Sequence, residues 1–108
     1  MSRNIDLSGK RALITGAAAG IGRACAVALA EAGSSIVAVD VNEQGLQQTI
    51  DAIGSGLAVR CDLSRPDDVD SMRDRVVAEL GGIDILVNCA GIISYKKGIG
   101  AFPVEEWD

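Results

Sequence analysis

Residues 15–22 read Thr-Gly-Ala-Ala-Ala-Gly-Ile-Gly, and this stretch separates two segments of different periodicity. Before it, residues 11–15 form a short run, Arg-Ala-Leu-Ile-Thr, that is typical of a buried strand. After it, residues 20–32 have helical spacing, and Gly33 supplies an end signal. On that helix the residues expected near one buried face are Ile21, Ala24, Ala28 and Leu29. The sequence therefore predicts a strand, a glycine-rich turn and a helix in succession.

The same alternation continues along the chain. Further strands are predicted at residues 35–39, 57–61 and 83–87, each a short apolar run. A helix from Asn42, its plausible N-cap, has a buried stripe of Leu46, Ile50 and Ile53. A third helix is expected to begin with Ser64 as N-cap and to bury Val69, Met72, Val76 and Leu80. Residues 91–100 are interpreted as a loop, and residues 102–108 as the start of another helix.

Strands that alternate with helices favour parallel pairing through right-handed crossovers. The strands are apolar without clean alternation, which indicates a sheet covered on both faces. We therefore expect an α/β fold, a Rossmann-like doubly wound parallel sheet of which only the first half, with strand order 3-2-1-4, is present. Residues 1–108 are interpreted as one incomplete dinucleotide-binding domain.

Composition excludes several classes of function. The net charge of −5 argues against binding to nucleic acid or to an anionic membrane through electrostatics. No run approaches the length that spans a bilayer, and residues 1–10 lack the apolar run that is typical of a signal peptide. Histidine is absent and the three cysteines match no ligand spacing, so we predict no metal site. Scattered cysteines favour the reducing cytoplasm.

The glycine-rich turn has the chemistry of a phosphate site. A pyrophosphate must approach the backbone closely, and a helix N-terminus offers it free amides and a positive dipole end. The residues predicted to form this cradle are Gly16, Ala19, Gly20, Ile21 and Gly22. The alternative is a turn that merely connects strand to helix.

Asp40 closes the second predicted strand at the offset expected for a ribose-binding carboxylate. Such a group accepts hydrogen bonds from the adenosine ribose hydroxyls and repels a 2′-phosphate. No Arg or Lys lies in the glycine turn or directly after Asp40. We therefore predict NAD(H) as cofactor in preference to NADP(H). The alternative is an acid that simply faces solvent at the end of a strand.

The spacing Thr-Gly-x-x-x-Gly-Ile-Gly resembles the signature of the short-chain dehydrogenase/reductase family. Cys61-Asp62-Leu63 is similar to the family's acid after the third strand, and Asn88-Cys89-Ala90-Gly91 to its Asn-Asn-Ala-Gly motif. The resemblance covers essentially the whole chain. It implies that Asp62 contacts adenine, that Asn88 ties strand ends together, and that Ala90 and Gly91 lie against the cofactor ribose. The alternative for Asp62 is that it only caps the turn into the helix of Ser64, and Asn88 is expected to be structural in either case.

The resemblance further implies hydride transfer between a nicotinamide cofactor and an alcohol or carbonyl substrate. The family's catalytic Ser and Tyr-x-x-x-Lys belong to a later part of the fold. Tyr95 does not supply that motif, because the residue four places after it is Ile99 and not Lys. We therefore assign no catalytic residue and expect these 108 residues alone to be inactive. The complete protein is expected to be a homo-oligomeric oxidoreductase. The alternative is a non-catalytic module for NAD binding or assembly.

Overall fold

The structure is a computed structural model that describes residues 5–89. Four strands and three helices alternate along this part of the chain. In order they are β1 (Arg11–Thr15), α1 (Gly20–Glu31), β2 (Ser35–Asp40), α2 (Glu43–Ile53), β3 (Leu57–Arg60), α3 (Pro66–Leu80) and β4 (Ile85–Asn88). The predicted helix at residues 102–108, and the loop before it, lie outside the described residues.

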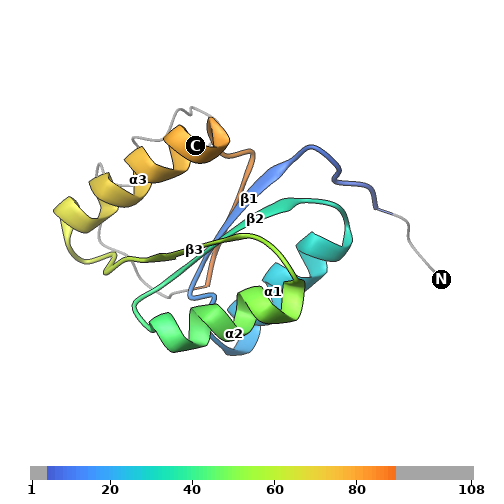
Figure 1. The fold of residues 1–108 in the computed structure, drawn as a ribbon, viewed down its shortest axis with the longest axis horizontal. Coiled ribbons are helices and arrows are strands. Elements are labelled where there is room, and N and C mark those ends of the chain that lie inside the picture. Colours follow the sequence, from blue (N-terminus) through green and yellow to red (C-terminus); the bar gives the residue numbers. More distant parts are fainter. Residues whose placement is uncertain (1–4, 90–108) are drawn as a thin grey trace.

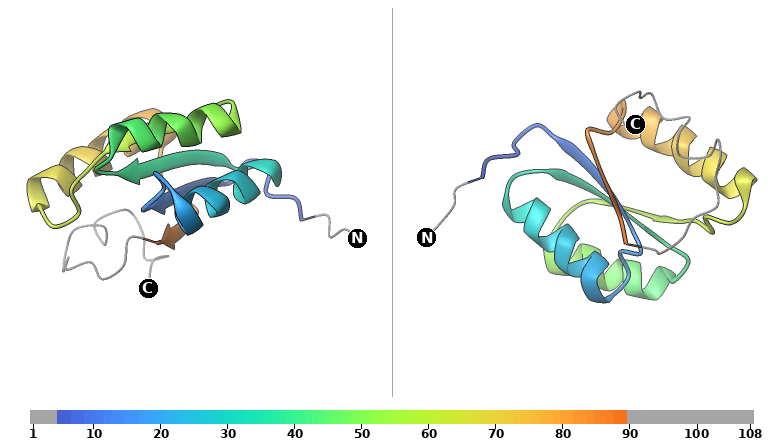
Figure 2. Two further views of the ribbon diagram at one scale, coloured as in Figure 1. Left: turned by 90° about the horizontal axis from the view of Figure 1, so that it is seen from below. Right: turned by 180° about the vertical axis from the view of Figure 1, so that it is seen from behind.

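The four strands form one parallel sheet in the order β3-β2-β1-β4, as predicted (Figure 1). Helices α1 and α2 lie side by side against one face, and α3 covers the other (Figures 1 and 2). The side chains of β1 alternate between the two layers: Leu13 packs with the residues of α3, whereas Ala12 and Ile14 pack with those of α1 and α2. This burial on both faces explains why the strands are continuously apolar.

The ends of the helices are set by their sequences. Asn42 caps α2, since its side chain accepts a hydrogen bond of 2.9 Å from the backbone N–H of Gly45. Gly54 and Gly81 end α2 and α3 in the left-handed conformation that glycine tolerates. No helix among residues 5–89 is long and apolar enough to cross a membrane.

Two local predictions were wrong. Ser64 does not cap α3, because the helix begins after Arg65 with Pro66 in its first turn, and the Ser64 hydroxyl is bonded to Asp62 instead. The buried face of α1 is also shifted. Ile21 is 76% exposed, and the buried residues of this helix are Gly22 and Ala26. The small size of Gly22 and Ala26 lets the helix approach the sheet closely, and Leu29 of the predicted face packs against the same core.

Candidate cofactor site

The predicted site residues gather at one edge of the sheet, where all four parallel strands end. The glycine-rich turn follows β1, Asp40 is the last residue of β2, Asp62 follows β3, and Asn88 is the last residue of β4. Thr15 lies opposite Asn88 in the register of β1 and β4, and Asp40 lies opposite Arg60 in that of β2 and β3. Ligands of open α/β sheets bind outside this carboxyl edge. The topology therefore brings the described members of the predicted set together.

Three glycines shape the turn between β1 and α1. Gly16 and Gly20 have positive φ angles of 69° and 59°. A β-carbon on Gly22 would overlap the carbonyl oxygen of Gly16, so the helix and the turn can meet only at glycine. A β-carbon on Gly20 would meet no atom within 4 Å, and Ala19 is exposed. The turn is thus tightly packed against α1 at Gly22 and open to solvent at Ala19 and Gly20. A phosphate site formed by backbone amides requires both properties.

The N-terminus of α1 differs from those of the other two helices. Its N-cap, Ala19, makes no side-chain hydrogen bond to the first turn, and that turn contains no acidic residue. By contrast, Asn42 caps α2 next to Glu43, and α3 begins with acidic residues at 67 and 68. An uncapped helix N-terminus keeps its amides and positive dipole end available to an anion. Among the three helices, α1 is the one prepared for a phosphate group.

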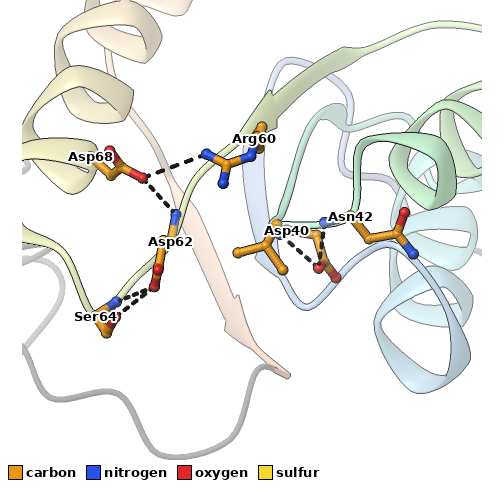
Figure 3. A network of polar contacts seen from close by, with 7 residues as sticks. Asp40, Asn42, Arg60, Asp62, Ser64 and Asp68 are labelled. Carbon is orange, nitrogen blue, oxygen red and sulfur yellow. Dashed lines mark hydrogen bonds and ion pairs between the residues drawn. The ribbon is translucent and has the colours of Figure 1, made fainter.

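Asp40 is held beside the turn by backbone amides. Its Oδ2 accepts from the Ala18 N–H at 3.0 Å. Its Oδ1 accepts from the N–H groups of Val41 and Asn42 at 2.7 and 3.2 Å, and the bond from Asn42 can be followed in Figure 3. The carboxylate is partly exposed. It therefore does more than face solvent at a strand end, because it joins β2 to the phosphate turn. It remains placed to accept a hydrogen bond from a ribose hydroxyl.

Asp62 forms a local turn with Ser64. Its Oδ1 accepts from the Ser64 hydroxyl at 2.6 Å and from the Ser64 N–H at 3.0 Å (Figure 3). The hydroxyl bond, followed by the backbone bond, lowers the pKa of Asp62 below its ordinary value. The turn-capping interpretation is therefore realised in the structure. Since both bonds go to one oxygen, the same carboxylate can also accept from an adenine amino group.

The residues beside Asp62 contribute differently. The Cys61 side chain is only 1% exposed and packs in the core beneath α3, so it can contact a cofactor only through its backbone. Burial, with Asp68 and Asp62 as lesser causes, raises the pKa of its thiol to about 11. Leu63 is partly buried and packs against the same core. Cys61 is thus an inert core residue.

Asn88 joins β4 to β1 as the resemblance implies. Its Oδ1 accepts from the Thr15 hydroxyl at 2.9 Å, and the Thr15 Oγ1 accepts from the Cys89 N–H at 3.2 Å. Thr15 is completely buried, so these bonds satisfy polar groups that water cannot reach. Ala90, Gly91 and Tyr95, also named above, lie outside the described residues.

Two cations near this edge were missed by the sequence analysis. Arg60 is the register partner of Asp40, but its guanidinium turns toward α3, with Nη1 3.7 Å from Asp68 (Figure 3). Arg23 follows Gly22 on α1 and bonds the backbone of the turn at Ala18. Local sequence signals could not have placed either group. Arg60 is brought to Asp40 by strand pairing, and Arg23 reaches the turn through its long side chain.

The comparisons with known proteins agree with this geometry. The family model for short chain dehydrogenase matches residues 10–108, and the chain belongs to this family. The chain is similar to the 7alpha-hydroxysteroid dehydrogenase of Escherichia coli K12, with 42% identity over 94 residues. That match covers 83% of this chain and 37% of the relative, so the chain spans well under half of the relative's length.

Two solved structures of similar proteins contain a nicotinamide cofactor. A 7 alpha-hydroxysteroid dehydrogenase complexed with NADH and 7-oxo glycochenodeoxycholic acid has a TM-score of 0.75 and 39% identity, covering 79% of this chain and 35% of that one. The L-sorbose reductase of Gluconobacter frateurii, complexed with NADPH and L-sorbose, has a TM-score of 0.77 and 36% identity, covering 87% and 38%. Family membership thus supports a nicotinamide cofactor without choosing between the two.

Proposed function

We propose that the full-length protein is an NAD(H)-dependent oxidoreductase that interconverts an alcohol and a carbonyl compound. The observation that carries the choice of NAD(H) is the Asp40 carboxylate, held at the end of β2 against the phosphate turn. A 2′-phosphate placed beside it would meet a negative charge. Arg60, the cation paired with Asp40 in register, instead forms its ion pair with Asp68.

The residues of the site have separate roles in this proposal. Asp40 accepts from the adenosine ribose, and Asp62 accepts from adenine. The pyrophosphate is bound by backbone amides of the turn, those of Gly16, Ala19, Gly20, Ile21 and Gly22. Asn88 holds the end of β4 against the end of β1. Ala90 and Gly91 are proposed to contact the cofactor ribose. When bound, the cofactor supplies hydride acceptance or donation, and the protein orients it.

The cofactor choice is tested by titrating the full-length protein with NADH and NADPH and following cofactor fluorescence. We expect NADH to bind at least about tenfold more tightly, which corresponds to about 1.4 kcal/mol. Equal dissociation constants would refute the assignment of Asp40 as the selector. Binding of neither cofactor would refute the proposed function as a whole.

Activity is tested separately from binding. The full-length protein is mixed with NAD and a panel of sterols, polyols and sugar acids, and NADH formation is followed by absorbance. Turnover of any member supports the enzyme. Tight NAD binding without turnover favours the alternative, a non-catalytic NAD-binding module, which fits the described residues because none of those at the site is assigned a catalytic role.

The proposal extends to the setting of the protein. We propose that the full-length protein is a homo-oligomer and that it is located in the cytoplasm. The free state of Cys25, Cys61 and Cys89 supports the proposed location. Light scattering of the full-length protein tests the oligomeric state. A strictly monomeric protein at micromolar concentration would contradict this part of the proposal.

A further inference from the structure

Arg23 makes an unusual set of contacts for a charged side chain near a phosphate site. Its guanidinium donates to four acceptors, all of them neutral, on the turn and on α2. They are Thr49 Oγ1 at 2.9 Å from Nε, and from Nη2 the Ala18 carbonyl oxygen, the Gly45 carbonyl oxygen at 3.2 Å and Gln48 Oε1 at 3.1 Å. No ion pair among residues 5–89 involves Arg23. Its position is therefore fixed by hydrogen bonds to the turn and to α2.

Thr49 continues this contact into the turn. Its side chain is completely buried, and its hydroxyl lies 2.6 Å from the Ala17 carbonyl oxygen and 3.2 Å from that of Gly45. A hydroxyl carries one proton, so the shorter contact to Ala17 takes it. The same oxygen accepts from Arg23. Guanidinium, hydroxyl and carbonyl thus form a chain in which each bond polarises the next.

The two contacts fix the direction of consecutive carbonyl groups in the turn. Thr49 binds the Ala17 carbonyl and Arg23 binds the Ala18 carbonyl, both toward α2. On the opposite side of Ala18, its N–H donates to Asp40. An anion at the turn requires amides that face it and carbonyl oxygens that face away, since carbonyl oxygens repel phosphate. Arg23 and Thr49 supply the second of these conditions.

Helix α2 contacts the turn directly at Gly45. A β-carbon on Gly45 would lie 2.7 Å from both the side chain and the carbonyl oxygen of Ala18, so α2 touches the turn at this point. Helices α1 and α2 run side by side on this face of the sheet (Figure 1). Arg23 reaches across their junction. The contacts of Arg23 and Thr49 therefore connect the turn to both helices.

We propose that Arg23 and Thr49 are positioning residues for the diphosphate of the cofactor. They hold the carbonyl groups of Ala17 and Ala18 against α2, and the amides of the turn thereby keep the orientation that binds the anion. Neither residue contacts the cofactor itself. This inference rests on the proposed function, because it assigns a role toward the same ligand.

The test compares two ligands that differ in the diphosphate group. Dissociation constants for ADP and for adenosine are measured by competition against NADH in the full-length protein. The informative variants are Thr49→Val, which keeps the shape but removes the hydroxyl, and Thr49→Ser, which keeps the hydroxyl. Arg23→Lys keeps the charge without the fork of donors. Arg75→Gln, on the exposed side of α3 where Arg75 pairs with Glu79, is the control.

We expect Thr49→Val and Arg23→Lys to weaken ADP by about tenfold or more, as for a lost bond to a charged group, and adenosine by less than about twofold. Thr49→Ser should restore the ADP affinity, and Arg75→Gln should leave both constants unchanged. Arg23 is on α1 and Thr49 is on α2, so either variant can test the proposal if the other fails to fold.

Equal weakening of ADP and adenosine in these variants would show a merely structural role and overturn the proposal, as would unchanged ADP affinity. A wild-type protein that binds neither ADP nor NADH would instead contradict the proposed function.

Discussion

Gly22 is the residue at which packing and cofactor binding depend most directly on one missing atom. A β-carbon there would overlap the Gly16 carbonyl and lie 3.0 Å from the Ala17 α-carbon, both of them backbone atoms that cannot rotate away. We predict that Gly22→Ala destabilises the full-length protein by about 3 kcal/mol, the upper range for overpacking. NADH affinity should also fall, because the turn must shift. Urea unfolding and NADH titration measure the two effects.

The control for that substitution is Ala28→Ser, at an exposed position of the same helix. It should leave both stability and NADH affinity nearly unchanged. A Gly22→Ala protein with wild-type stability would mean that the turn and α1 are less closely packed than the structure shows.

Asp40 has two tasks that a substitution would separate. It is proposed to bind the ribose, and it also holds the Ala18 N–H at 3.0 Å. We predict that Asp40→Ala weakens NADH by about tenfold or more, since a charged hydrogen-bond acceptor is lost. NADPH should gain little, because removal of the repulsion is offset by the loosened turn. Glu43→Gln, which removes the same charge from the exposed first turn of α2, is the matched control. Unchanged NADH affinity in Asp40→Ala would contradict the prediction.

At the scale of elements, an ion pair fastens the start of β1 to the start of β4. Asp84 accepts from the Arg11 Nε and from the Arg11 backbone N–H, at 2.9 and 2.8 Å. These bonds, the side-chain bond first, lower the pKa of Asp84 to about 2. Unfolded, the group titrates near 3.9, so its stabilisation is complete above about pH 4 and is lost as the pH falls toward 2. Since both side chains are about a third exposed, the contribution is at most about 1 kcal/mol.

Asp84→Asn should therefore lower the free energy of unfolding by up to about 1 kcal/mol at neutral pH and by only a small part of that near pH 2, where the carboxyl is partly protonated in the folded protein. Urea unfolding of the full-length protein across that pH range measures the difference. Asp70→Asn, at an acid on α3 that is 58% exposed, should produce no such pH-dependent gap. A gap that persists at pH 2 would show that the substitution acts through packing and not through charge.

The helices and strands also show which features could be predicted from the sequence. The strand order could be predicted, and so could the location of Asp40 and Asn88 at the carboxyl ends of two strands, because apolar runs, glycines and acids are local signals read against a fixed topology. The bounds differ, since the strands predicted at residues 35–39 and 83–87 are Ser35–Asp40 and Ile85–Asn88. The buried face of α1 could not, since Ile21 lies at the open carboxyl edge where helical periodicity meets no sheet. The Arg23–Thr49 contact was equally hidden. It joins two residues that lie 26 positions apart in the sequence and on different helices, and no spacing rule connects their side chains.

At the scale of the whole molecule, the edge of the sheet at β4 determines whether the 108-residue chain associates with itself. Within residues 5–89, β4 pairs only with β1, and Ile85, Leu86 and Val87 are each partly exposed. An apolar edge with unpaired backbone groups is a template for self-association. We predict that the 108-residue chain alone associates at micromolar concentration, whereas a full-length protein that covers this edge does not aggregate.

The edge itself is tested by Val87→Lys, which places a charge on β4 and should shift the 108-residue chain toward monomer in a light-scattering concentration series. Val77→Lys adds the same charge on α3, at a side chain that is 41% exposed and remote from the edge, and should leave the association unchanged. Circular dichroism establishes that each variant is folded. A wild-type 108-residue chain that is monomeric and unfolds cooperatively in urea would contradict the prediction, because it would show that the β4 edge seen within residues 5–89 does not drive association.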